Sequence, residues 1–148
     1  MTYLVPILIF VFLFFFTFFQ WRTYSKLPKK SSDKNDKHKN YDQHNERIYK
    51  DFDFFVKVFI ALVGAMGFVR FNYYKEYHDV ARQAMQGIGA IALLTMVSLS
   101  IFIICHQGSK IRRWEKVEWK NLIFWQEFWM LISMYLFAST LWIVSNKW

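Results

Sequence analysis

The residues best suited to chemistry gather in one short polar segment between two apolar runs. Glu76, His78 and Asp79 lie in the stretch RFNYYKEYHDVARQ, and carboxylate and imidazole groups are ligands that several metal ions accept. The other three histidines fall in distant parts of the chain, so nothing completes the ligand set. The segment therefore predicts a tyrosine-rich surface loop, with partner recognition as the alternative, and no metal site.

Two ionisable side chains stand inside long apolar runs. Lys57 lies near the start of the run at 52–71, and Glu127 lies near the start of the run at 122–144. Charged groups in such positions are rare in membrane proteins and commonly have a partner or a function. Because both are predicted near the same membrane face, we expect them to pair, with a structural role favoured over a coupling site.

Small and polar residues recur at helical spacing on three of the apolar runs. Such side chains let helices approach closely and form hydrogen bonds between them. We predict that they are helix-packing positions, and the alternative is that they line a hydrated pore. The residues concerned are Gly64, Gly67, Gly87, Thr95, Ser98, Gln126, Ser133 and Thr140.

The sequence contains no motif for catalysis. It has no G-x-S-x-G, no glycine-rich phosphate loop and no H-E-x-x-H, which are patterns that place a nucleophile, a phosphate or a metal. We therefore expect no enzymatic activity, no cofactor and no metal. The single Cys105 excludes an internal disulfide and is expected to pack within its apolar run.

The composition decides what kind of elements must position these residues. Of 148 residues, 55% are hydrophobic and 22% are aromatic, yet 19 Lys and Arg oppose 11 Asp and Glu for a net charge of +8. In a soluble domain the charges would be spread among the apolar residues, whereas here they are segregated. This segregation is typical of a chain that lies in lipid.

Four apolar runs are long enough to cross a membrane as helices. About twenty residues at 1.5 Å each cover the roughly 30 Å of hydrocarbon. The first run carries no charge and follows no Lys or Arg, so we expect it to be retained rather than cleaved. The sequence thus predicts an all-α, polytopic integral membrane protein whose four transmembrane helices, in a helical bundle, cover about 3–21, 52–71, 85–105 and 122–144.

Polar segments separate these runs. Residues 22–50 have few aliphatic side chains and predict a basic, flexible cytoplasmic linker, which leaves 51–148 as a three-helix membrane region. In the segment 109–121, Ile111, Trp114 and Val117 recur at helical spacing among charged residues. That pattern predicts an amphipathic helix on the membrane surface.

The basic residues also predict the orientation in the membrane. Fourteen of the nineteen Lys and Arg residues fall in the segments 22–50 and 109–121, and such residues favour the cytoplasmic side. Both termini are then non-cytoplasmic, and we expect a bacterial inner (plasma) membrane location. The cations predicted to bind anionic headgroups or an acidic partner, rather than nucleic acid, are Lys29, Lys30, Lys34, Lys37, Lys39, Lys110, Arg112, Arg113 and Lys116.

Together these features predict a non-enzymatic membrane subunit. We expect it to form a homo-oligomer or a complex with other proteins, and to anchor or sense for that assembly through its basic cytoplasmic face. One alternative is a pore-forming or membrane-disrupting effector of the lysis or anti-phage type. A second is a membrane immunity or inhibitor protein.

Overall fold

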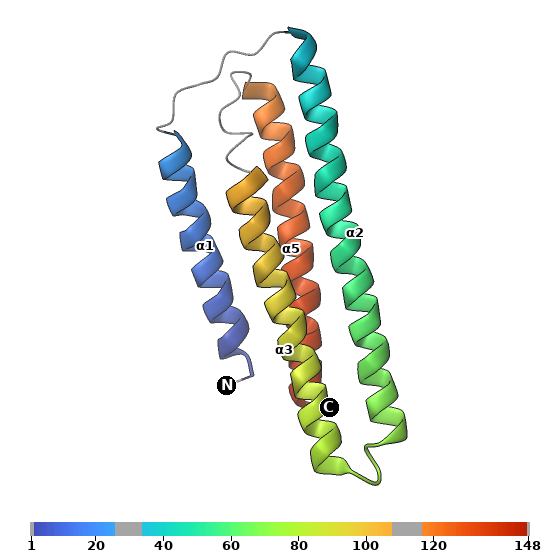
Figure 1. The fold of residues 1–148 in the computed structure, drawn as a ribbon. Coiled ribbons are helices and arrows are strands. Elements are labelled where there is room, and N and C mark those ends of the chain that lie inside the picture. Colours follow the sequence, from blue (N-terminus) through green and yellow to red (C-terminus); the bar gives the residue numbers. More distant parts are fainter. Residues whose placement is uncertain (1, 26–33, 108–116, 148) are drawn as a thin grey trace.

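The computed structural model is a bundle of long helices (Figure 1). It describes residues 2–25, 34–107 and 117–147, and no strand occurs among them. The elements are α1 (Leu4–Ser25), α2 (Lys34–Asn72), α3 (His78–Phe102), the short π-helix η1 (Ile103–Gln107) that continues α3, and α5 (Val117–Lys147).

Three of the helices are long and apolar enough to cross a membrane. The segments are Glu46–Asn72, His78–Cys105 and Trp125–Lys147, and the shortest of them has 23 residues, or about 35 Å of helix. Helix α1 is apolar over the shorter stretch Leu4–Gln20. The predicted all-α, four-helix bundle architecture is confirmed.

Successive helices run in opposite directions along the bundle (Figure 1). The ends of the chain and the turn between α2 and α3 lie at one end, which we name the termini end. The end of α1, the start of α2, η1 and the start of α5 lie at the other. Each long helix therefore leads the chain from one end of the bundle to the other.

The helices extend further than the apolar runs predicted. Helix α2 begins at Lys34, so much of the expected linker 22–50 is helical. Its Lys, Glu, Gln and Arg residues are good helix formers, and extending an existing helix is far easier than starting one. Helix α5 begins at Val117, so the last residues of the expected interfacial segment 109–121 belong to it, and 108–116 lie outside the described residues.

Helices α2, α3 and α5 enclose the core. Several of its fully or nearly fully buried side chains are methionines, whose unbranched and flexible chains fill irregular space between helices. On α5 the buried positions follow a spacing of three or four, which keeps them on one face. The core includes Phe55, Met66, Met85, Met96, Met134 and Ala138.

Helix α1 lies at the edge of this bundle, where it packs against α3 and η1 and is hydrogen-bonded to α5 through its N-terminal part. Pro6 has no N–H, so it cannot form the helical hydrogen bond to the carbonyl oxygen of Thr2. The indole Nε1–H of Trp142 donates to that oxygen at 2.9 Å, and the Tyr135 hydroxyl donates to the carbonyl oxygen of Pro6 at 3.0 Å. Two side chains of α5 thus hold the first turn of α1.

Removing these two donors should loosen the attachment of α1 without unfolding the core. In the double variant Tyr135→Phe and Trp142→Phe, each lost hydrogen bond weakens docking by about 1 kcal/mol. Hydrogen–deuterium exchange in detergent should then increase in α1 by several fold and stay constant in α3. The variant Trp129→Phe, at an outward-facing position of α5, serves as the control. Unchanged exchange in α1 would contradict the role of the two bonds.

Candidate functional site

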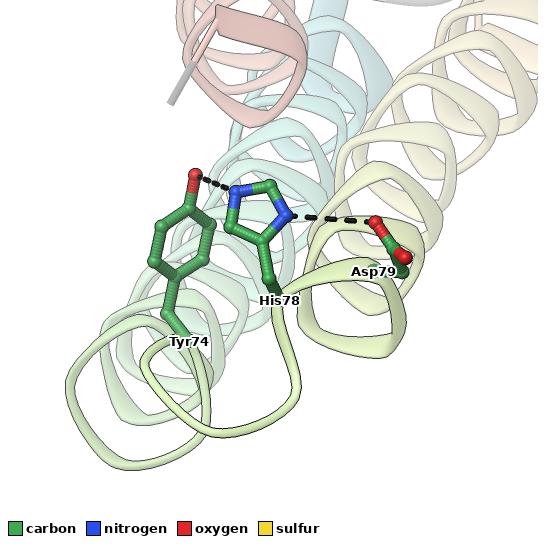
Figure 2. A network of polar contacts seen from close by, with 3 residues as sticks. All are labelled: Tyr74, His78 and Asp79. Carbon is green, nitrogen blue, oxygen red and sulfur yellow. Dashed lines mark hydrogen bonds and ion pairs between the residues drawn. The ribbon is translucent and has the colours of Figure 1, made fainter.

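The clearest polar network lies in the turn at the termini end (Figure 2). The Tyr74 hydroxyl lies 2.7 Å from Nε2 of His78, and Nδ1 of the same ring lies 3.5 Å from the Asp79 carboxylate. The guanidinium of Arg70 stacks on the ring of Tyr74, 3.6 Å from its centroid. Four side chains, from the end of α2, the turn and the start of α3, are therefore linked.

The backbone of the turn explains why these side chains meet. Helical hydrogen bonds continue through it, from Tyr77 N–H to the Tyr73 carbonyl at 2.9 Å and from Ala81 N–H to the Tyr77 carbonyl at 2.9 Å. Residues 74 and 78 are four apart, so this local geometry places them on one face. Their rings lie 4.4 Å apart between centroids.

The exposure of the network limits its chemistry. The side chain of His78 is 54% exposed and that of Asp79 is 96% exposed, so water screens both groups. Among the described residues, no three His, Cys, Asp or Glu side chains gather to hold a metal ion, so Glu76, His78 and Asp79 form no such group. These polar contacts can hold the turn after α2 against the start of α3.

A shallow apolar pocket lies between the same two helices. It has a volume of about 480 Å³ and is lined by Val69, Tyr73, Tyr77, Val80, Ala81 and Ala84. Aliphatic and aromatic carbon forms nearly all of its surface, so hydrocarbon fits it better than a polar substrate.

Lys57 has a different partner from the one predicted. Its ammonium group forms an ion pair with the Asp53 carboxylate at 2.5 Å, four residues earlier on α2. Asp53 lies one turn closer to the polar start of the helix, so the long Lys57 side chain extends away from the middle of the span. The expected pair of Lys57 with Glu127 is replaced by this intrahelical pair.

Gln126 is the predicted packing residue that does join two helices. Its side-chain amide donates to the Tyr49 hydroxyl at 3.0 Å, which links α5 to α2. Glu127 follows it on α5 and is half-buried. These contacts lie at the end of the bundle opposite to the chain termini.

Three of the four predicted hydroxyl residues form hydrogen bonds within their own helices. Thr95, Ser133 and Thr140 each donate to the carbonyl oxygen four residues earlier, at 2.9, 2.8 and 2.7 Å. Thr140 and Ser98 are exposed on the outside of the bundle. The serines in the core are others, Ser100, Ser139 and Ser145.

The glycine at the closest helix contact is Gly89, which the sequence did not single out. A Cβ atom at this position would collide with the Ser145 hydroxyl and lie 3.2 Å from the Trp142 Cα, so α3 and α5 meet backbone to backbone. At Gly64, Gly67 and Gly87 a Cβ atom would have no neighbour within 4 Å. These three glycines are therefore not packing positions within one chain.

The predicted basic surface lies mostly outside the described residues. Lys34, Lys37 and Lys39 belong to the first turns of α2. The other cations of the set, Lys29, Lys30, Lys110, Arg112, Arg113 and Lys116, fall in 26–33 and 108–116, which are not described. Their binding to lipid or to a partner stays a prediction.

No protein-family model, curated protein or solved structure matches this chain, so its function has to be inferred from its own residues.

Proposed function

We propose that the chain is a non-enzymatic integral membrane subunit that assembles with further protein chains and presents its basic residues on the cytoplasmic side. The observation that carries this proposal is the outward position of its small residues. Gly64, Gly87 and Ser98 are exposed, and both glycines leave open space where a side chain would stand. Within a membrane, small residues on a helix surface allow another helix to approach.

The lipid environment makes this argument specific. Apolar side chains contact lipid tails as well as they contact protein, so an exposed Leu or Phe says nothing about a partner. Glycine costs about 1 kcal/mol in a helix relative to alanine. Placed where the chain's own packing does not need it, glycine favours a helix from another molecule.

The orientation with both termini outside belongs to the same proposal. The described termini and the α2–α3 turn share one end of the bundle (Figure 1), and that turn region carries three of the basic residues, Arg70, Lys75 and Arg82. The segments 22–50 and 109–121, with fourteen cations, connect helices at the other end. An excess of this kind favours the cytoplasm for the second end.

A mass measurement on the detergent-solubilised complex tests the proposal. Purified from its own membrane, the wild-type chain should give a mass above that of its 18.0 kDa monomer. With Lys29, Lys30, Lys34, Lys37 and Lys39 all changed to Gln, bound protein partners should decrease about tenfold or more, because each cation contributes about 1 kcal/mol to an anionic surface. A monomeric wild-type chain would refute the proposal.

A pore is the second candidate, favoured by the outward hydroxyl-bearing positions Ser98 and Thr140. Around the axis of an oligomer, such residues would line a polar path. Dye release from liposomes that contain the purified chain distinguishes the two functions. A subunit without a pore retains the dye, whereas a pore releases it.

A further inference from the structure

The apolar pocket between α2 and α3 changes in character along its length. At the turn it is lined by Tyr73 and Tyr77, which lie outside the membrane-spanning segments of α2 and α3. Further in it is lined by Val69 and Ala84, which lie inside those segments. Ala84 stands seven residues beyond Tyr77, or about 10 Å along α3. The pocket therefore leads from the edge of the membrane-spanning region into its apolar part.

This change in polarity matches that of a membrane lipid. Tyrosine rings favour the headgroup layer, because they have an apolar body and a polar hydroxyl, whereas aliphatic side chains favour acyl chains. Val80 is 66% exposed and Ala84 is also exposed, so the pocket opens toward the surrounding lipid. An acyl chain can therefore enter from the side, with the polar end of its lipid beside the tyrosines.

The size of the pocket fits a small ligand rather than a second protein. Its volume of about 480 Å³ lies within the range of about 300 to 1,000 Å³ that small-molecule sites occupy. A helix from another chain needs anchor positions over several turns of a groove, whereas the residues of α3 that line this pocket span about two turns. One hydrocarbon chain is the ligand that the size and the apolar lining favour.

The charges around the turn add a preference for the headgroup. Arg70, Lys75 and Arg82 lie in or beside the turn, and the carboxylates among them are Glu76 and Asp79. The balance is an excess of one positive charge, which favours a negatively charged phospholipid over a neutral one. Lys75 is exposed and lies in the turn between the two tyrosines that line the pocket, at the end where a lipid headgroup belongs.

We propose that this pocket is a binding site for one acyl chain of an anionic phospholipid, whose phosphate lies at the level of Lys75 and whose hydrocarbon lies beside Ala84. The bound chain contacts Val69 of α2 and Ala84 of α3, and so stabilises the packing of the two helices near the turn. This inference goes beyond the proposed function, because it requires the membrane but no second protein chain.

Lipid retention in native mass spectrometry tests the site. The detergent-solubilised protein is weighed with increasing phosphatidylglycerol, and the same series is measured for Ala84→Trp, in which an indole ring fills the pocket. The variant should retain one lipid fewer per chain than the wild type, because only the pocket is closed. An equal number of bound lipids for Ala84→Trp and the wild type would overturn the inference.

Leu94→Trp is the matched control for this variant. It adds the same ring at an exposed position of α3, about 15 Å further along the helix than Ala84. Because the ring then lies outside the pocket, Leu94→Trp should retain as many lipids as the wild type. A loss of one lipid in both variants would show that an added indole ring, rather than closure of the pocket, causes the loss, and would also overturn the inference.

The headgroup is tested with Lys75→Gln. The difference in bound lipid between a chain with and without Ala84→Trp gives the occupancy of the pocket. In the wild type, half-occupancy should need about fivefold less phosphatidylglycerol than phosphatidylcholine, and Lys75→Gln should remove this preference. Lys147→Gln, which removes a cation that lies over the ring of Tyr3 instead, should keep it. A Lys75→Gln chain with the full preference would show that the headgroup assignment is wrong.

Photo-crosslinking provides a test that needs no variant. A phosphatidylglycerol with a photoreactive group halfway along one acyl chain, in liposomes with the wild-type protein, should label the peptide that contains Ala84 severalfold more than the peptide that contains Leu94. Both positions are exposed on α3, so lipid that only surrounds the protein labels them alike. Equal labelling would therefore overturn the inference even where Ala84→Trp does not fold.

Discussion

Replacing Gly89 with leucine should destabilise the bundle by about 3 kcal/mol, while the same change at Gly87 should leave its stability nearly unchanged. At Gly89 the new side chain would have to enter the space of the Ser145 side chain and the backbone at Trp142. Helices α3 and α5 form the most extensive helix–helix contact among the described residues, so relief of the clash requires the last turn of α5 to move away from α3. At Gly87 the added side chain meets no atom within 4 Å.

The two variants form a matched pair on one helix, two residues apart. Thermal unfolding in detergent should show a large decrease in melting temperature for Gly89→Leu only. Size-exclusion chromatography of the heated samples reports the aggregation that accompanies unfolding. Gly87→Ala should be equal to or more stable than the wild type, because alanine is the better helix former by about 1 kcal/mol. An unchanged melting temperature for Gly89→Leu would show that α3 and α5 do not approach at Gly89.

Truncating Met134 to alanine should cost about 2 to 5 kcal/mol, the range expected for a cavity in a packed core. Met134 is fully buried between the helices, and its neighbours in the core are held in place by α2 and α3. The loss combines the removed contacts with the empty space that the neighbours cannot fill. Chemical or thermal unfolding of the detergent-solubilised protein measures this cost.

Leu136→Ala is the control for this truncation. Leu136 lies two residues further along α5 and is 58% exposed to the surroundings. Lipid or detergent replaces the lost methyl groups at that position, so the change in the free energy of unfolding should stay within about 0.5 kcal/mol. If Leu136→Ala is as damaging as Met134→Ala, the assignment of inward and outward faces on α5 is wrong.

The sequence predicts the helices well because long apolar runs have few alternatives in a membrane. The runs at 52–71 and 122–144 each lie inside one helix, and the run at 85–105 lies in α3 and its continuation η1. The helix ends were not predicted, because backbone hydrogen bonding continues past the apolar residues into Lys34 and His78. Hydropathy detects the lipid-facing length of a helix rather than its full length.

The sequence does not predict which face of each helix is inside. In a soluble protein the polar face points out, but the membrane-spanning helices are apolar all round. Gly87 and Gly89 are therefore equivalent in the sequence, and only the structure separates them. The ion pair between Lys57 and Asp53 could be predicted from the sequence, because Asp53 stands four residues before Lys57, at the spacing that favours such pairs.

The missing amide hydrogen of Pro6 has a consequence for how the protein is made. The carbonyl oxygen of Thr2 receives its hydrogen bond from Trp142, a residue 140 positions later in the chain. Synthesis proceeds from the N-terminus, so α1 is made long before the helix that supplies this hydrogen bond. The hydrogen bonds from Trp142 and Tyr135 are then among the last contacts of α1 to form, and a chain that stops before α5 keeps only the packing of α1 against α3 and η1.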